Sequence, residues 1–289
     1  MKCNVCGTVS VSGGGDRESA SCEVCHSSAR IRAVMLVLSR ALFGMDLALS
    51  EFPVLKSVRG MGISDSDIYS NRLASLFSYT NTFYHREPFF DLTKPDSAEF
   101  GRYDFVICSD VLEHIPPPAD VAFETLAKLL KPSGVLILTL PYSLEPATIE
   151  HFPQLQEFGI LDLGGRSVLV NRVGEGYEVH DRLVFHHGPG HTLEMRVFTE
   201  AEIRAKLVTA GLTEVLIQSP VSEEFGVRET GPCSLPIVAR RQPFALSASG
   251  VSELVSQWVE QKRLVAAVGE SRWVQLGRRL SVGPDVRGK

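Results

Sequence analysis

Between Arg102 and Ser109 the chain reads Tyr103-Asp104-Phe105-Val106-Ile107-Cys108, which is apolar at nearly every position. A strand that is apolar on both faces is typical of a parallel sheet covered by helices on both sides. A helix is predicted over residues 120–130, and Lys131-Pro132-Ser133-Gly134 is expected to end it. Residues 135–140 form the next buried strand. Strands that alternate with helices predict a doubly wound, mostly parallel α/β sheet.

The same alternation continues on both sides of this unit. Hydrophobic periodicity, capping residues and glycine stops place the remaining elements. The predicted strands are residues 54–63, 80–85, 212–218 and 235–240. The predicted helices are residues 31–42 before Gly44, a helix from a cap at Asp65 or Asp67 through about Phe77, residues 199–210 with Thr199 as cap, and residues 251–280.

The alternation breaks between Pro141 and Val197. Residues 166–173 and 177–185 are two strand candidates joined by Gly174-Glu175-Gly176. This pattern predicts a β-hairpin inserted between two α/β units.

Four cysteines lie within the first 25 residues, as Cys3 and Cys6, then Cys22 and Cys25. Two pairs with two intervening residues each fit a tetrahedral structural zinc site. The glycine-rich segment between the pairs has too few large apolar residues to form a core, so a metal is its expected organiser. Two disulfides or four free thiols are the alternatives. With four thiolate ligands the zinc site is closed and therefore structural.

Residues 103–114, which end in Ser109-Asp110-Val111-Leu112-Glu113-His114, and residues 129–141 together resemble the class I S-adenosylmethionine-dependent methyltransferases. In that family the two segments are the fourth strand with its loop and the fifth strand with the preceding helix end. The resemblance spans roughly residues 54–240. It implies a Rossmann-like fold and S-adenosylmethionine as cofactor. The chain also resembles a bacterial subgroup in which two cysteine pairs precede an arginine-bearing helix, here with Arg30 and Arg32.

The resemblance implies a set of cofactor-binding residues at the carboxyl ends of the strands. The expected glycine-rich turn is Gly60-Met61-Gly62-Ile63-Ser64-Asp65, which lacks the family's third glycine. The acid usual at the end of the second strand is also absent, which leaves Tyr84, His85 or Glu87 as ribose ligands. The expected contacts are Gly60, Met61, Gly62, Asp65, Tyr84, Asp91, Leu92, Ser109 and Asp110. For Asp91 a turn cap is the alternative.

Histidines are concentrated in the segments expected on the acceptor side. A methyl transfer to a hydroxyl needs a base, and histidine suits that task at neutral pH. His151 follows the fifth strand and is the first candidate, ahead of His187 and His191. Surface or packing histidines are the alternative. A second metal held by several of these histidines and Asp181 is conceivable, but the spacing matches no established pattern.

The net charge of −5 and pI near 5.9 argue against a duplex nucleic-acid surface, which usually needs a basic field. No apolar signal segment and no transmembrane segment is expected. Thiolate metal ligands without an export signal predict the reducing cytoplasm. The basic C-terminal tail is expected either to pack on the domain or to contact a partner or anionic surface.

These observations predict a methyltransferase with three parts: a zinc ribbon at residues 1–28, a class I methyltransferase domain at 29–241 with an acceptor-side insertion at 142–197, and a helical tail at 250–289. O-methylation of a small molecule, sugar or glycan is the expected reaction. RNA or protein methylation is one alternative. A non-catalytic scaffold that binds partners through a degenerate methyltransferase fold is the other.

Overall fold

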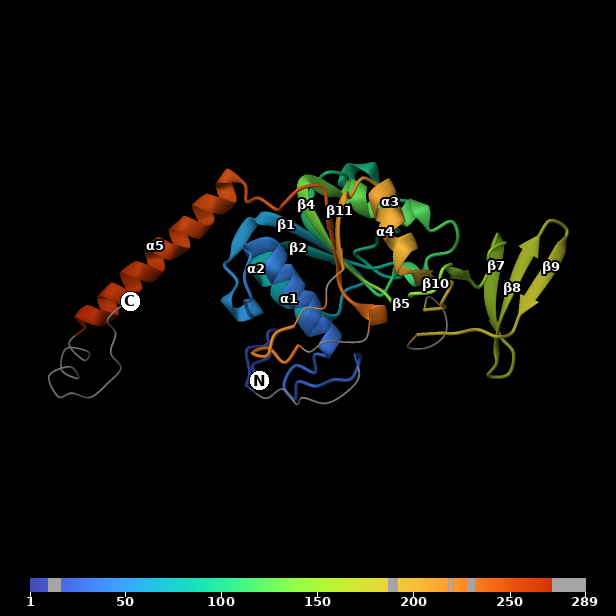
Figure 1. The fold of residues 1–289 in the computed structure, drawn as a ribbon, viewed down its shortest axis with the longest axis horizontal. Helices are drawn as coiled ribbons and strands as arrows, with labels where there is room; N and C mark the ends of the chain where they lie inside the picture. The colour runs from blue at the N-terminus through green and yellow to red at the C-terminus, as the bar shows by residue number, and fades with distance from the viewer. Residues whose placement is uncertain (10–16, 187–191, 218, 220, 228–231, 272–289) are drawn as a thin grey trace.

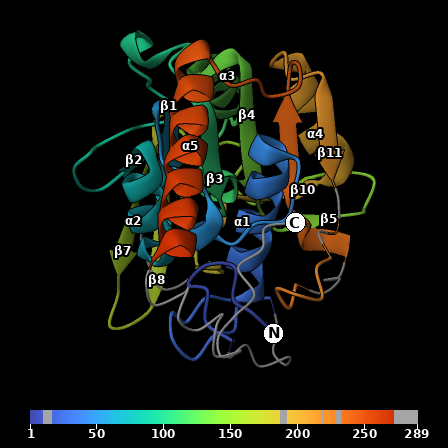
Figure 2. The same ribbon diagram turned by 90° about the vertical axis from the view of Figure 1, so that its left-hand side faces the viewer.

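The computed structural model describes residues 1–9, 17–186, 192–217, 219, 221–227 and 232–271. Its centre is a six-stranded sheet with the order β11-β12-β4-β3-β1-β2. Figure 2 shows these strands side by side, with β2 and β11 toward opposite edges. They are β1 (Leu55–Ile63), β2 (Phe77–Thr82), β3 (Tyr103–Ser109), β4 (Leu130–Thr139), β11 (Glu214–Ile217) and β12 (Ile237–Arg240).

Strands β1 to β4 pair in parallel, and β12 runs antiparallel to both of its neighbours. Helices cover both faces, which confirms the doubly wound sheet. On one face lie α1 (Ala29–Phe43) and α2 (Asp67–Leu76), whose buried residues join one core cluster. On the other lie α3 (Asp120–Leu129) and α4 (Glu200–Thr209), whose apolar residues join a second cluster. All parallel strands therefore end at one edge, as the fold class requires for ligand binding.

Several predicted boundaries are wrong. The strand predicted over residues 80–85 lies at residues 77–82, because Phe77 and Tyr79 are buried against the sheet. Ser66, rather than Asp65 or Asp67, caps α2 by accepting from the backbone N–H of Ile68. Lys131-Pro132-Ser133-Gly134 does not separate helix from strand, since β4 begins at Leu130. Gly44 does end α1, with a φ of 71° in the left-handed region.

The insertion contains more than the predicted hairpin. Strands β8 (Ser167–Val173) and β9 (Gly176–His180) form that hairpin, and β7 (Glu157–Asp162) adds a third antiparallel strand. A second small sheet is made of β5 (Tyr142–Ser143), β10 (Arg196–Thr199) and β6 (Ile149–Glu150). Figure 1 shows β7, β8 and β9 projecting from the end of the molecule opposite α5 (Ala248–Glu270).

Helix α5 packs on the sheet only through its first turns. Glu253 accepts from the backbone N–H of Ser57, and the Gln257 amide exchanges hydrogen bonds with the backbone of Val54. Further along, Trp258 and Leu264 are exposed. The predicted tail beyond Ser271 lies outside the described residues.

No described helix is long and apolar enough to cross a bilayer. The remaining short elements are 3-10 turns: η1 (Leu49–Glu51), η2 (Ser97–Glu99), η3 (Leu112–His114) and η4 (Pro232–Ser234).

Candidate functional site

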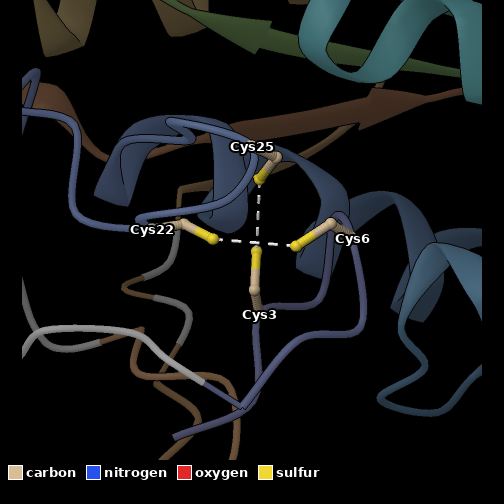
Figure 3. Close-up of side chains that lie close together, drawn as sticks. All are labelled: Cys3, Cys6, Cys22 and Cys25. Carbon is tan, nitrogen blue, oxygen red and sulfur yellow. Dashed lines mark hydrogen bonds between the residues drawn. The ribbon is translucent and has the colours of Figure 1, made fainter.

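The four N-terminal cysteines converge on one point (Figure 3). The Sγ atoms of Cys3 and Cys25 lie 3.7 Å apart, and those of Cys6 and Cys22 lie 3.6 Å apart. These separations are far beyond the roughly 2.05 Å of a disulfide. Four sulfurs at about 2.3 Å from a central zinc ion stand about 3.8 Å from one another in a tetrahedron. The arrangement therefore fits a tetrahedral metal site.

The surroundings of the cysteines also suit a thiolate cluster. The Ser27 hydroxyl lies 3.3 Å from the Sγ atoms of both Cys3 and Cys25. Arg32 is buried beside the cluster and donates to the Ser27 carbonyl at 3.0 Å. A buried cation there offsets negative charge on the sulfurs. Arg32 thus faces the cysteines and not the carboxyl ends of the strands.

The cysteine module is continuous with the main core. Cys3, Val5 and Cys22 belong to the same buried cluster as Val34 and Met35 of α1. Asn4 is fully buried and donates to the carbonyl of Arg32 at 2.9 Å. Order at the cysteines is therefore coupled to the packing of α1 on the sheet.

Two arginines of this N-terminal region reach the carboxyl end of β3. Arg30 donates to the Ser109 hydroxyl at 2.6 Å and pairs with Asp110 at 3.0 Å. Arg17 pairs with the other oxygen of Asp110 at 3.1 Å. Burial would raise the pKa of Asp110, but the guanidinium groups of Arg30 and Arg17 hold that pKa below its ordinary value. The predicted residues Ser109 and Asp110 are thus brought together with two cations.

The predicted glycine turn has a different geometry from the expected one. Gly60 and Gly62 lie inside β1, and the turn itself begins at Ser64, which adopts a φ of 57°. A Cβ atom on Gly60 would collide with the Phe105 ring, and one on Gly62 would collide with Tyr79 and Asp65. Both positions need glycine because protein side chains already fill the space beside them. A substitution at Gly62 would therefore disturb the protein as well as any bound cofactor.

Asp65 lies at the centre of a buried polar group beyond the end of β1. Its carboxylate accepts from the Tyr79 hydroxyl, and its backbone N–H donates to Asn81 at 2.9 Å. Burial raises the pKa of Asp65 to about 7. Asp65 Oδ1 and the Tyr69 hydroxyl are buried without a well-formed hydrogen bond among the described residues, although the Tyr69 hydroxyl is near enough to Asp65 to lower the pKa of that carboxyl; Arg17 Nε, beside Asp110, is a further buried atom without a partner. Unpartnered buried polar atoms at the strand ends mark a place for a polar ligand.

Asp65→Asn is expected to remove a pH-dependent part of the stability. Because the pKa of Asp65 is raised, ionisation of this carboxyl destabilises the folded state: the penalty is absent below about pH 4, where Asp65 is protonated in both states, and is complete once the pH has risen through about 7. A shift of about three units corresponds to the order of 4 kcal/mol. Relative to the variant, the wild type should therefore lose free energy of unfolding between pH 4 and 8. Urea unfolding across that range tests this, with exposed Asp67→Asn as control. A pH-independent difference between wild type and variant would contradict it.

The other predicted cofactor residues are more scattered. Met61 and Leu92 have buried side chains in the core, which leaves only their backbones for a ligand. Asp91 accepts from the backbone N–H and the hydroxyl of Thr93, as a turn cap does. Tyr84 is 52% exposed and packs against Phe89. A cavity of about 290 Å³ lies beside the end of β2, lined among others by Tyr79, Asn81 and Glu87.

His151 belongs to a cluster that the sequence did not reveal. Its Nε2 atom lies 2.9 Å from Glu194, whose other oxygen lies 3.0 Å from Nε2 of His186. The His186 ring packs edge-on against His114, 5.0 Å between centroids. Glu113, next to His114 in η3, completes the cluster. His187 and His191 lie outside the described residues, and Asp181 pairs with Arg166 away from this cluster.

Burial dominates the titration of the two η3 residues in this cluster. It raises the pKa of Glu113 well above its ordinary value, with the charge of Asp110 as a second cause. It lowers the pKa of His114. Both residues therefore favour their neutral forms. One signal for this cluster was visible in the sequence, the Glu113-His114 pair that follows a buried strand, whereas no pattern indicated Glu194.

Comparisons with known proteins support a methyltransferase domain in this region. Residues 47–174 match a family model described as "Methyltransferase domain", which covers β1 to β4 and the insertion through β8. A ubiquinone biosynthesis O-methyltransferase of Marinobacter nauticus is 31% identical over 93 residues, 32% of this chain and 38% of that relative. The match thus spans well under half of the relative.

The solved structures that match this chain have low sequence identity and low TM-scores. A Burkholderia thailandensis 1,6-didemethyltoxoflavin N1-methyltransferase with bound S-adenosylhomocysteine is 16% identical, with a TM-score of 0.42, covering 73% of this chain and 77% of that one. A sugar N-methyltransferase of Streptoalloteichus is 13% identical, with a TM-score of 0.38, covering 64% and 81%. Of these comparisons, the family match carries the most weight: residues 47–174 are similar to a methyltransferase domain.

Proposed function

We propose that this protein is an S-adenosylmethionine-dependent methyltransferase that methylates a hydroxyl of a small molecule, sugar or glycan. The observation that carries the proposal is the set of charged groups at the carboxyl ends of β1 and β3. Arg30, Arg17, Asp110 and Asp65 provide both signs of charge beside polar atoms that have no partner. The amino-acid end of the cofactor is a zwitterion, so it needs such a mixed set.

The rest of the cofactor is assigned to the end of β2. Glu87 lines the cavity there and is our candidate for the ribose hydroxyls in place of the missing strand-end acid. Tyr84 and Asp91 remain candidates for the adenine side, and the backbones of Met61 and Leu92 for close contacts. When bound, the cofactor supplies the electrophilic methyl group. The chain's residues then have to orient the acceptor and remove its proton.

We further propose that Cys3, Cys6, Cys22 and Cys25 hold one structural zinc ion. The sulfur separations of 3.6 and 3.7 Å support this assignment, and four thiolates leave no open position for catalysis. Residues 1–28 then form a zinc module, residues 29–241 the catalytic domain with its insertion at 142–197, and residues 250–289 a tail. Thiolate ligands that form no disulfide suit a reducing cytoplasm.

His151 is the proposed acceptor-side base. Its hydrogen bond to Glu194 can orient the ring, as a carboxylate partner commonly does for a catalytic histidine. His151→Ala is expected to lower turnover by about a hundredfold or more with little change in cofactor affinity. Release of S-adenosylhomocysteine with a panel of hydroxylated acceptors measures turnover. His180→Ala is the control, since His180 belongs to the same insertion but contacts Phe152 and Glu178.

Equal turnover of the His151 variant and the wild type would assign the base elsewhere. RNA or protein methylation, or a scaffold role, remain the competing functions. Lack of any binding of S-adenosylhomocysteine in calorimetry would favour the scaffold and overturn the enzymatic proposal.

A further inference from the structure

We infer that Glu113, His114, His186 and Glu194 form a second metal site, for a divalent transition-metal ion, between η3 and the insertion. A mixture of nitrogen and oxygen ligands suits ions such as Zn²⁺, Mn²⁺ or Fe²⁺. The cysteine cluster differs, because all of its ligands are sulfur. The site is separate from the four cysteines and uses none of the groups proposed to hold the cofactor.

Geometry is the first argument. One ligand atom each from Glu113, His114 and His186 lies within 4.8 Å of the other two. Ligands at about 2.1 Å from one ion stand at most about 4.2 Å apart, on opposite sides of it. Side-chain shifts of less than about 1 Å would thus bring all three atoms into a coordination sphere. Glu194 adds a carboxylate at 3.0 Å from Nε2 of His186.

Glu113 provides a second and independent observation. Its side chain is fully buried, and neither carboxylate oxygen has a hydrogen-bond partner among the described residues. One of its oxygens lies 3.8 Å from Nε2 of His114, beyond hydrogen-bond range. Arg17 lies within electrostatic range, but that side chain is engaged with Glu18 and Asp110. A buried carboxylate with unmet hydrogen-bonding capacity is costly unless a ligand or ion satisfies it.

His114 has the orientation of a metal ligand. Its Nδ1 atom lies 3.1 Å from the carbonyl oxygen of Leu193, which fixes the proton on Nδ1. Nε2 then carries the free lone pair, and it lies 3.8 Å from a carboxylate oxygen of Glu113. Metal-binding histidines commonly donate their second ring nitrogen to a backbone carbonyl in this way.

Backbone hydrogen bonds hold η3 and the insertion, the two segments that carry the ligands, next to each other. The N–H of Met195 donates to the carbonyl of Glu113 at 2.8 Å, and the N–H of Glu194 donates to Val184 at 2.8 Å. Arg196 is fully buried and ties η3 to the insertion through the carbonyl of Leu112 and the Glu150 carboxylate. The ligands are therefore supported by ordered backbone rather than by exposed side chains.

The consequence for chemistry rests on the proposed function. A metal ion beside His151 would bind an acceptor hydroxyl and lower its pKa, which eases loss of the proton before methyl transfer. The binding experiment below uses no cofactor and no acceptor. Its failure would thus leave the methyltransferase proposal standing, and failure of that proposal would not remove the metal site.

The test is Mn²⁺ binding to the full chain, measured by equilibrium dialysis with electron paramagnetic resonance of the free ion. Thiolates select softer metals, so Mn²⁺ reports on nitrogen and oxygen ligands and not on the cysteines. We expect one Mn²⁺ per wild-type chain, with affinity at least tenfold lower in Glu113→Gln and in His186→Asn. His180→Asn should bind as the wild type does. After exposure to Zn²⁺ and desalting, the wild type should also hold one zinc more than Glu113→Gln.

Two results would overturn the inference. One is a wild-type chain that binds no Mn²⁺ and holds no zinc beyond that of the cysteines. The other is Mn²⁺ binding of equal strength in the wild type, Glu113→Gln and His186→Asn, which would mean adventitious binding. Circular dichroism and retained cysteine-bound zinc establish that both variants fold. Glu113→Gln preserves the shape of the buried side chain. His186 is less buried than Glu113, so its substitution disturbs the core less.

Discussion

Cys22→Ser is expected to release the metal of the cysteine cluster and to destabilise the whole domain. A metal present at a thousandfold above its Kd stabilises the folded state by about 4 kcal/mol. Each kcal/mol shifts the midpoint of unfolding by about 2–4 °C for a domain of this size, so a decrease of about 8–16 °C is expected. The loss should spread beyond the first residues because Cys3 and Cys22 share a core cluster with α1.

Elemental analysis and thermal unfolding measure these two effects. Cys233→Ser is the matched control, since Cys233 is a half-buried thiol outside the cluster. The control should keep one zinc and an unchanged midpoint. If Cys22→Ser retained the metal, or if protein purified without chelator contained none, the zinc assignment would be wrong.

Arg30→Gln is expected to weaken binding of S-adenosylhomocysteine by about tenfold to a hundredfold. A hydrogen bond to a charged group contributes about 1.5–3 kcal/mol, and every 1.4 kcal/mol is a factor of ten in affinity. The Arg30 guanidinium is the cation that contacts Ser109 and Asp110, where the cofactor carboxylate is proposed to lie. Arg17 still pairs with Asp110 in the variant, so the buried carboxylate keeps one partner.

Calorimetry of the product complex gives the affinity directly. Arg40→Gln is the matched control, because Arg40 lies at the other end of α1 and pairs with Asp46. Its affinity should equal that of the wild type. Unchanged or tighter binding in Arg30→Gln would mean that Arg30 serves the protein's own ion pairs and does not hold the cofactor.

The competing scaffold function makes the opposite prediction for this experiment. A scaffold that has lost the cofactor would use Arg17 and Arg30 only to fasten the N-terminal module to β3. Neither the wild type nor any variant would then bind the product. Titration of the wild type with S-adenosylhomocysteine therefore distinguishes the methyltransferase from the scaffold before any acceptor is known.

Local sequence determined the elements whose signals do not depend on distant residues. The run from Tyr103 to Cys108 is apolar on both faces, so its place in the interior of a parallel sheet could be predicted. Gly44 and Thr199 were predicted at helix ends because capping is a short-range effect. The cysteine pairs could likewise be predicted to converge, since their spacing alone limits the geometry.

Tertiary structure decided the details in which packing outweighs local preference. Phe77 and Tyr79 shift β2 toward the N-terminus because the sheet buries them. Positions 60 and 62 of β1 require glycine because Phe105 and Tyr79 occupy the adjacent space, which no local pattern records. Arg30 reaches Ser109 across 79 positions of the chain.

The acceptor side shows most clearly the difference between what the sequence predicts and what only the tertiary structure decides. The sequence suggested His151 from its place after a strand, but it gave no reason to join that residue to Glu113, His186 and Glu194. The β10 region and η3 bring those groups together through backbone hydrogen bonds between residues far apart in the chain, such as Met195 and Glu113. Periodicity and spacing report on neighbours along the chain, whereas a convergent site depends on how separate elements pack, and only the folded structure contains that information.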